Sequence, residues 1–464
     1  MNSKDTINSI DKMQKIDKNT IKIILNLLAQ FLEGKIDRFF ENYRANLKVI
    51  HYYNEIIRYW NKINFVIRKT LRVLKEYDKF DKQYISNKEN WTYWMTIYLY
   101  ATYRVILESN SIDLLIKELN SFINMPNDKI KFSQFLIKLR TFNWERAFQG
   151  KSHIERLSLE EAIPTFVIQH LLPVMSFEFL KKNLHFMNNL IQHTDCTIRI
   201  NTLQANLIPN IKQTLEKSGI LIQEDSEIPE LFHIPIKKRP ILLQTELYKS
   251  GYLIFQDKAS VIVGNLLDPQ PGEFVCDMCA APGLKTSLIA QSADNSTVII
   301  AVDVHTHRVY QMKYLLKQLN VLNAQLINAD SYTLPIKSNI QFDRVLLDAP
   351  CTGTGTFLTN PVLKWRQNKS FLEQNCHFQF KLLEAALHIL KPRGILVYST
   401  CSLYPEEGEL QILRHLDMLK PLKLPDWLSP SYKIDNNVIA GTGRLFPAVH
   451  HIKGFFIAKF EKKT

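Results

Sequence analysis

Residues 274–290 read FVCDMCAAPGLKTSLIA. The first five residues form an apolar run that predicts a buried strand, and residues 284–291 predict a helix after a loop that contains Gly283. A strand that leads through a glycine loop into a helix is the start of a β-α-β unit. We therefore expect this part of the chain to have an α/β fold.

The same alternation continues to the end of the sequence. Continuous apolar strands that alternate with helices predict a parallel sheet covered on both faces. Such sheets bind ligands beyond the carboxyl ends of their strands, so the candidate site residues are sought there. The further expected strands are 298–304, 325–330, 344–349, 394–400 and 454–460, and the further expected helices are 306–319, 371–390 and 406–416.

Glycine usage separates the remaining parts of the chain. Three of the 14 glycines precede residue 251, and since glycine is unfavourable inside helices, the first 190 residues are expected to be all-helical. A helical pair interrupted at Pro164 and a strand at 197–204 then predict a small α+β insert. The expected domains are 1–150, 151–250 and 251–464.

Composition limits the class of protein. The 464 residues are 46% hydrophobic and 22% charged, and we find no run of 18 apolar residues and no secretory signal, so a cytoplasmic protein without a membrane partner is expected. Six sparse cysteines predict free thiols. The net charge of +13 fits a polyanionic partner, and it fits equally well a lysine-rich proteome with solvated helix faces.

The loop DMCAAPGLKTS, residues 277–287, suits a ligand with a carboxylate or phosphate at a helix N-terminus. It lacks the first glycine of a P-loop, and the dinucleotide pattern G-x-G-x-x-G is also missing. A small cofactor without a pyrophosphate is therefore expected, and a nicotinamide-dependent oxidoreductase is excluded.

Acidic residues follow the next two strands. Asp303 lies where such folds bind ribose hydroxyls, and Asp330 ends the strand after it. The alternative for both is a cap on the following helix, which we disfavour for Asp303 and disfavour only slightly for Asp330. Cys276 and Cys279 have the spacing of a metal or redox pair, but no second pair exists, so unligated thiols are expected.

Two thiols occupy neighbouring strand ends. DAPCTGTG (348–355) places Asp348 and Cys351 after the fourth strand, and STCSLYPEEGE (399–409) places Cys401 after the fifth. A lone cysteine is more often a small buried hydrophobe than a nucleophile. Two thiols that face one pocket beside an aspartate predict nucleophilic chemistry.

Together these motifs resemble the Sun/Fmu-type (Nop/Sun family) RNA cytosine-5 methyltransferases, the group that contains the bacterial rRNA methyltransferase B. The resemblance runs from about residue 160 to 460 and rests on CAAPGLKT, DAPCTGTG and STCSLYPEEGE in that order. QDKAS (256–260), RLFPAVHHIKGFF (444–456) and IRINT (198–202) agree, the last within a small RNA-contacting insert.

The resemblance implies a Rossmann-like S-adenosylmethionine-dependent methyltransferase core with an α+β RNA-binding insert and an all-helical N-terminal domain. It implies that Cys401 is the nucleophile, that Cys351 helps to release the product, and that Asp348, protonated or sharing a proton, donates to the cytosine ring. DNA-type enzymes place the nucleophile in the Pro-Cys motif, so swapped roles for the two cysteines are the minority alternative. The implied cofactor-binding residues are Cys279, Ala280, Ala281, Pro282, Gly283, Leu284, Lys285, Asp303, Arg308, Asp330 and Asp348.

The sequence departs from the family pattern at Leu284, Ala448 and Lys453. The N-terminal domain carries a basic, aromatic segment that is either an RNA-binding face or, more often for such stripes, part of the core. Its residues are Tyr52, Tyr53, Arg58, Tyr59, Trp60 and Lys62.

The expected substrate is RNA, with rRNA preferred and tRNA as the alternative. A catalytically silent RNA-binding assembly factor is the competing interpretation, but such a protein would be expected to lose Cys351 or Cys401. We expect a monomer that binds no metal.

Overall fold

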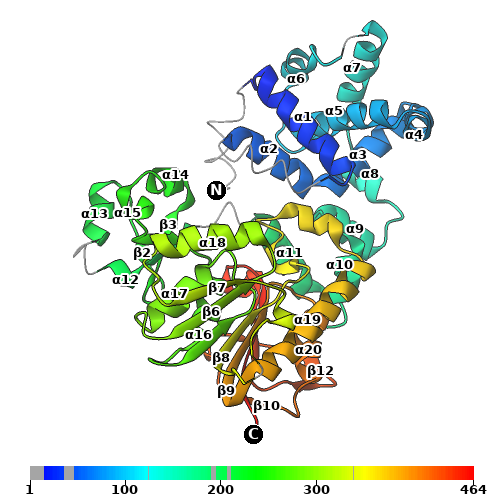
Figure 1. Cartoon of the computed structure of the whole chain (residues 1–464). Coiled ribbons are helices and arrows are strands. Elements are labelled where there is room, and N and C mark those ends of the chain that lie inside the picture. The colour runs from blue at the N-terminus through cyan, green and yellow to red at the C-terminus, as the bar shows by residue number, and fades with distance from the viewer. Residues whose placement is uncertain (1–14, 36–45, 124, 190–194, 206–210, 338) are drawn as a thin grey trace. The chain divides into compact units, whose positions relative to one another are not determined.

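The computed structural model describes residues 15–464 apart from 36–45, 124, 190–194, 206–210 and 338. The chain forms two compact units (Figure 1). Unit 1 is Met1–Gln169 with Asn360–Trp365, and unit 2 is His170–Thr359 with Arg366–Thr464. The expected boundaries at 150 and 250 fall inside these units, so the three-domain division stays a prediction.

Unit 1 is helical throughout its described residues, as its low glycine content predicts. Ile24, Ile56 and Leu99 are among the fully buried residues of its core. No helix in the described part of the chain is both long enough and apolar enough to cross a membrane. The helices are α1 (Lys18–Leu32), α2 (Leu47–Arg58), α3 (Trp60–Val73), α4 (Tyr77–Ser86), α5 (Lys88–Ile106), α6 (Ile112–Leu119), α7 (Pro126–Arg140), α8 (Trp144–Phe148), α9 (His153–Glu160) and α10 (Thr165–Leu171), the last of which crosses into unit 2.

The aromatic segment of unit 1 belongs to the core. Tyr53 and Arg58 are only 5% and 2% exposed, and Tyr52, Tyr59 and Trp60 pack against the same cluster. These contacts favour the core alternative for the segment, although the rings of Tyr52, Tyr59 and Trp60 are only partly buried.

The insert of unit 2 is a small antiparallel sheet with the strand order β2-β3-β1-β4. Its strands are β1 (Asp195–Ile200), β2 (Gln223–Glu224), β3 (Leu231–Pro235) and β4 (Leu253–Phe255). The helical segments that precede and surround them are α11 (Phe177–Asn189), α12 (Thr202–Ala205), α13 (Ile211–Lys217), η3 (Ile236–Lys238), α14 (Arg239–Leu242) and α15 (Glu246–Lys249).

The central sheet of unit 2 has the order β11-β14-β15-β9-β8-β5-β6-β7, and β10 pairs with β15. Neighbours from β7 to β9 are parallel, whereas β15 is antiparallel to β9. The prediction of a parallel sheet is therefore wrong for the last strand, β15. This strand lies between β9 and β14 and is antiparallel to both. The strands are β5 (Phe274–Asp277), β6 (Val298–Asp303), β7 (Ala324–Asn328), β8 (Phe342–Asp348), β9 (Leu390–Thr400), β10 (Leu419–Pro421), β11 (Ser429–Pro430), β14 (Thr442–Leu445) and β15 (Phe455–Lys462), with a separate hairpin of β12 (Lys433–Ile434) and β13 (Asn437–Val438).

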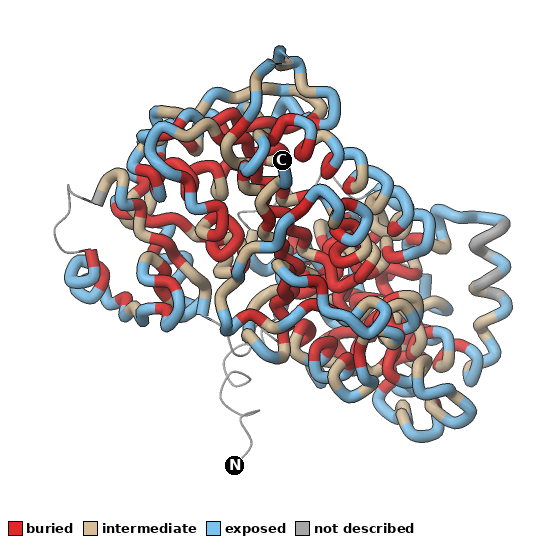
Figure 2. The backbone as a smooth tube through the Cα atoms, turned by 90° about the horizontal axis from the view of Figure 1, so that it is seen from below, coloured by how far each residue is buried: buried red, intermediate tan, exposed pale blue. Residues whose placement is uncertain are grey.

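Helices cover both faces of this sheet. Leu288 of α17 packs with Val275 and Ile299 on one face, where Met312 of α18 also packs, and Leu383 of α19 packs with Cys276 on the other. In Figure 2, buried and exposed stretches alternate along the backbone. The helices are α16 (Lys258–Leu267), α17 (Leu284–Ser292), α18 (Thr306–Gln318), α19 (Lys369–Ile389), α20 (Glu409–Leu413) and α21 (Pro447–His450), with short turns η4 (Ser331–Thr333), η5 (Thr354–Thr356), η6 (Pro361–Arg366, which crosses between the units) and η7 (Pro405–Glu407).

The parallel strands β5, β6 and β8 end in carboxylates at the same edge of the sheet, and β9 ends immediately before Cys401. This edge is where the sequence predicts the site.

Candidate active site

The loop after β5 packs closely against α18. Gly283 has φ 101°, and a Cβ atom there would lie 2.8 Å from Cγ of Met312, so a side chain at this position is strained and crowded. Helix α17 begins at the next residue, Leu284, and Thr286 donates a hydrogen bond of 2.7 Å to Asp277. The loop is therefore fixed at both ends.

Asp303 connects this loop to α18. Its carboxylate accepts hydrogen bonds from the backbone N–H groups of Ala281 (3.3 Å) and His305 (3.0 Å), and Nη1 of Arg308 lies 3.3 Å from Oδ2. Arg308 also donates to the carbonyl oxygen of Ala281. The structure thus brings Ala281, Asp303 and Arg308 together, as expected for one binding site.

Asp330 differs from Asp303, because it serves as the N-cap of η4 with a bond of 3.4 Å from the N–H of Tyr332. The capping alternative therefore describes its contacts. Asn328, which the sequence did not indicate, donates a bond of 2.9 Å to the carbonyl oxygen of Asp303 and ties β7 to this edge.

Cys276 and Cys279 lie in and just after β5, and burial raises the pKa of both thiols. Among the described residues, no group of three or more His, Cys, Asp or Glu is placed to hold a metal ion. In the same loop, the backbone N–H of Ala280 donates a hydrogen bond of 2.9 Å to the carbonyl oxygen of Val302. The N–H of Gly283 donates one of 2.7 Å to the carbonyl oxygen of Ala280.

Lys285 and Asp348 form an ion pair beside the thiols. Nζ lies 2.6 Å from Oδ2, and Ser399 donates a bond of 2.6 Å to Oδ1. Burial opposes the charge on Lys285, but the Asp348 carboxylate outweighs it and raises the lysine pKa. Both oxygens of Asp348 thus have donors, and one of these donors is the Lys285 ammonium group.

The two predicted thiols meet. Sγ of Cys351 lies 3.1 Å from Sγ of Cys401, and the N–H of Gly355 donates a bond of 2.9 Å to the Cys401 carbonyl oxygen. The hydrogen bond with Cys401 and burial raise the pKa of Cys351 well above its usual value. Cys351 therefore keeps its proton, and either sulfur can be the donor in the contact between the two.

A buried carboxylate, Glu407, supports the thiol pair. Oε1 accepts a bond of 2.8 Å from the N–H of Thr352 and one of 2.9 Å from Nε2 of Gln379, and the hydroxyl of Thr352 donates to Oε2. Thr352 follows Cys351 directly, so Glu407 fixes the loop that carries this thiol. The sequence contained Glu407 in YPEEGE but gave it no role, and it carried no signal for Gln379.

A second buried group holds the loop that carries Cys401. Arg444 is 0% exposed, pairs with Glu409 at 2.6 Å, and donates a bond of 2.9 Å to the carbonyl oxygen of Ser402. Ser402 in turn exchanges a hydrogen bond of 3.1 Å with Thr354. Both thiol loops are thereby held in one network, which the sequence did not reveal because its members come from four separate segments.

The IRINT motif anchors the insert. Arg199 is 0% exposed and donates to Gln256 at 2.7 Å and to Ser287 of α17 at 2.8 Å. Asn201 is 1% exposed and donates to the carbonyl oxygen of Leu319. Since both side chains are buried, they position the insert rather than contact a ligand in solvent.

The departures from the family pattern are accommodated locally. The N–H of Ala448 donates a bond of 3.0 Å to Asn183, Lys453 pairs with Asp257 at 3.2 Å, and Leu284 is the first residue of α17. None of these contacts disturbs the thiol pair.

Comparison with known proteins places this site in a family. Residues 264–461 match the model of a family described as 16S rRNA methyltransferase RsmB/F. A probable ribosomal RNA small subunit methyltransferase B of Synechocystis is 32% identical over 274 residues, which are 58% of this chain and 61% of that protein. A tRNA (cytosine(72)-C(5))-methyltransferase of Pyrococcus horikoshii is 34% identical over 229 residues, 49% of this chain and 57% of that protein.

One solved structure aligns with a larger share of this chain than these two relatives do. A methyltransferase homologue from Pyrococcus horikoshii is 32% identical and aligns with 67% of this chain and 99% of its own, with a TM-score of 0.57. The core is thus a Rossmann-like methyltransferase fold. The chain spans between 42% and 61% of the length of the first curated relatives that it matches.

Proposed function

We propose, because this chain belongs to the RsmB/F methyltransferase family, that it transfers a methyl group from S-adenosylmethionine to carbon 5 of a cytosine in RNA. The observation that carries the proposal is the pair of thiols of Cys351 and Cys401, 3.1 Å apart beside Asp348. Carbon 5 of cytosine is too electron-poor to attack a methyl sulfonium directly, so the reaction needs a nucleophile and a proton donor.

Cys401 is the nucleophile in this scheme. Its sulfur adds to carbon 6 of the cytosine and forms an enamine whose carbon 5 is electron-rich. Cys351, whose raised pKa keeps it protonated, stabilises the neighbouring sulfur by donating a hydrogen bond. After methyl transfer a base takes the carbon 5 proton, the electrons of that C–H bond re-form the double bond between carbons 5 and 6, and the bond from carbon 6 to the Cys401 sulfur breaks. The sulfur leaves as a thiolate, and protonated Cys351 is placed to assist this release by donating to it.

Asp348 and Lys285 act on the ring nitrogen. Lys285 donates a hydrogen bond of 2.6 Å to Asp348, so a proton of its ammonium group can pass by way of the carboxylate to the nitrogen as negative charge develops there. Ser399 keeps the carboxylate in place. The target base has to leave its stack to reach this pair, which costs a few kcal/mol and costs least in single-stranded RNA.

The residues at the neighbouring strand ends fit the cofactor. Asp303 lies where ribose hydroxyls bind in this fold, and Gly283 lets the loop with Ala281 approach closely. Arg308 and Lys285 complete the surroundings, together with Cys279, Ala280, Pro282, Leu284 and Asp330. When bound, S-adenosylmethionine supplies the electrophilic methyl group.

The substrate class that we propose is ribosomal RNA, processed in the cytoplasm. The description of the matched family names 16S rRNA, and the net charge of +13 suits a polyanion. A tRNA substrate is the alternative that one relative's name favours. The presence of Cys351, Cys401 and Asp348 argues against a catalytically silent assembly factor.

Labelled S-adenosylmethionine tests the proposal. Wild-type protein is incubated with unmodified small ribosomal subunits, with free rRNA and with tRNA, and the nucleosides are analysed. We expect label in 5-methylcytosine from an rRNA sample and none with Cys401→Ser. Label in tRNA alone would select the alternative substrate, and no label in any RNA class would contradict the proposal.

A further inference from the structure

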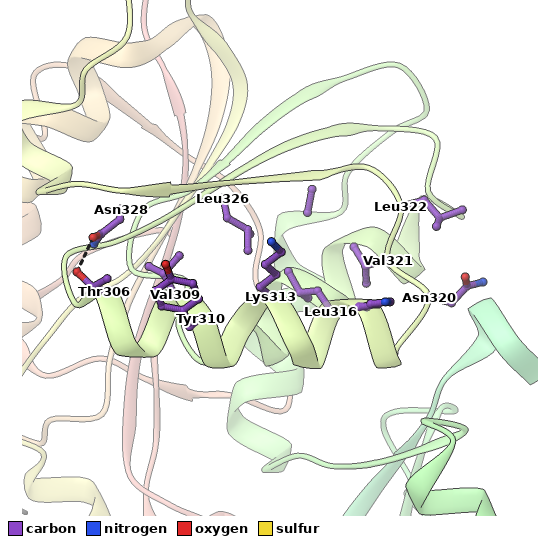
Figure 3. A pocket seen from close by; sticks show the side chains of 12 residues that line it. Thr306, Val309, Tyr310, Lys313, Leu316, Asn320, Val321, Leu322, Leu326 and Asn328 are labelled. Carbon is purple, nitrogen blue, oxygen red and sulfur yellow. Dashed lines mark hydrogen bonds between the residues drawn. The ribbon is translucent and has the colours of Figure 1, made fainter.

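A groove of about 870 Å³ lies between α18 and β7, the strand at one end of the central sheet (Figure 3). This volume is in the range of ligand sites. The groove is separate from the thiol pair, which does not line it. Its lining residues come from α18, from the turn after it and from β7, and those that matter here are Tyr310, Lys313, Leu316, Lys317, Val321 and Leu326.

One exposed stripe of α18 runs along the groove: Tyr310, Lys313 and Lys317 line the groove, and Tyr314 lies next to them on the helix, outside the lining. Tyr310, Lys313, Tyr314 and Lys317 follow the i, i+3, i+4, i+7 spacing that places side chains on one helix face. The tyrosines are 60% and 73% exposed, although large aromatic side chains usually bury their rings. The stripe alternates aromatic rings with positive charges.

The charge in the groove has one sign. No Asp or Glu is among the twelve described residues that line it, so Lys313 and Lys317 meet no carboxylate there. In Figure 3 Lys313 extends from α18 toward Leu326 on β7. A positive groove with exposed rings is the arrangement by which proteins bind single-stranded nucleic acid, with phosphates on the cations and bases on the rings.

The floor of the groove is apolar. Leu316, Val321 and Leu326 line it, and Thr306 donates a bond of 2.7 Å to Asn328, which closes the end nearest to Asp303. Apolar side chains of this kind accept the flat face of a base, and the two lysines suit the phosphates beside it. A protein strand added to β7 would use the backbone edge and would leave the lysines without a role.

The groove joins the two parts of unit 2 that face a substrate. At its start α18 carries Arg308, which contacts Asp303 in the candidate site. At its end the insert contacts α18, since Gln204 donates a bond of 2.7 Å to the carbonyl oxygen of Gln318. A single-stranded nucleic acid that lay along α18 would therefore extend from the edge of the active site to the insert.

We propose that this groove, the α18 groove, binds a single-stranded segment of the RNA substrate next to the target cytosine. Tyr310 and Tyr314 stack on bases, and Lys313 and Lys317 contact phosphates. The inference deepens the proposed function and rests on it for RNA as the substrate, but it is tested by binding alone.

The test measures binding of a fluorescent, single-stranded 20-nucleotide oligoadenylate to the full-length protein without cofactor, at several salt concentrations. Lys313→Gln/Lys317→Gln is expected to weaken binding about tenfold and to reduce the slope of log K against log salt by about 1.4, since each phosphate contact contributes about 0.7 for single strands. Tyr310→Leu/Tyr314→Leu is expected to weaken binding about fivefold or more with the slope unchanged.

The matched control is Lys420→Gln/Lys433→Gln, which removes two exposed lysine charges from β10 and β12, away from the groove. Its affinity and slope should stay within twofold of wild type. If both groove variants behave like this control, RNA does not use the groove, and a protein partner on β7 becomes the occupant to test.

A second measurement uses wild-type protein, so that misfolding of a variant cannot decide the outcome. Lysine acetylation is mapped with and without the oligoadenylate, and Lys313 and Lys317 should be protected by RNA while Lys433 is not. Equal acetylation of all three would overturn the inference. Methyl transfer is assayed separately, so protection without transfer contradicts the proposed function alone, and transfer without protection contradicts the groove alone.

Discussion

The sulfur of Cys351 lies 3.1 Å from the sulfur of Cys401, although 50 residues separate them in the chain. The two thiols follow the neighbouring parallel strands β8 and β9, whose pairing places Asp348 opposite Ser399. This pairing, more than either cysteine alone, makes the site suitable for covalent chemistry on a base.

The first prediction concerns thiol reactivity. Because the hydrogen bond with Cys401 and burial raise the pKa of Cys351, iodoacetamide at pH 7.5 should alkylate Cys401 before Cys351. Peptide mass spectrometry over time measures both rates. Cys376, whose pKa burial raises to about 12, is the slow reference on α19. Faster alkylation of Cys351 than of Cys401 would reverse the assignment of the two thiols.

The second prediction concerns Glu407. In Glu407→Gln the new NH₂ group faces N–H and O–H donors of Thr352 and Gln379, so at least one buried donor loses its acceptor. Urea unfolding should show a loss of about 1–3 kcal/mol, and methyl transfer should fall because the Cys351 loop shifts.

The control for this substitution is Glu406→Gln, since the Glu406 side chain is 32% exposed. It should cost less than half as much stability. Equal effects of the two substitutions would mean that the Glu407 carboxylate does not hold the loop.

The third prediction concerns pH and Asp277. Burial raises the pKa of Asp277 from 3.8 to about 6, although Thr286 and Lys285 oppose this shift. The folded state therefore binds this proton more tightly than the unfolded state, so its contribution to stability is present below pH 3.8 and is lost as the pH rises to 6.

Asp277→Asn keeps an acceptor for Thr286 but cannot ionise, so the variant does not lose stability in this way as the pH rises. The free energy of unfolding of the variant minus that of wild type should rise by about 2 kcal/mol between pH 4 and pH 7. A difference that is flat with pH would show that Asp277 titrates normally in the folded protein.

The fourth prediction concerns the ion pair of Lys285. Lys285→Met removes the ammonium group that donates to the Asp348 carboxylate, so methyl transfer should fall about 100-fold or more while the fold is retained. Lys453→Met is the matched control, because it also removes a partly buried, ion-paired lysine. If both variants lose the same activity, the effect of Lys285 is structural.

Much of unit 2 follows from the sequence because its strands are continuous apolar runs that end in polar residues. The five parallel strands and the helices 284–291, 306–319 and 371–390 are found close to their expected positions, and the two thiols meet as their strand ends predict. The direction of β15 does not follow, because apolar content is the same for parallel and antiparallel partners.

The sequence does not indicate the supporting residues, for a physical reason. Glu407 and Arg444 look like exposed charges in a sequence, since burial depends on partners such as Thr352 and Glu409 that lie far away along the chain. The aromatic segment from Tyr52 to Lys62 is ambiguous in a different way. Aromatic and basic residues are typical of an RNA-binding face, but aromatic rings at helical spacing are also typical of a helical core, which is where this segment packs.

Trapping the covalent intermediate tests the central claim most directly. Cys351→Ser and Cys401→Ser proteins are incubated with S-adenosylmethionine and the RNA that wild type methylates, and adducts that survive denaturation are mapped by mass spectrometry. The account predicts an RNA adduct on Cys401 in Cys351→Ser, where release is impaired, and none in Cys401→Ser. An adduct on Cys351 in the Cys401→Ser protein would contradict it.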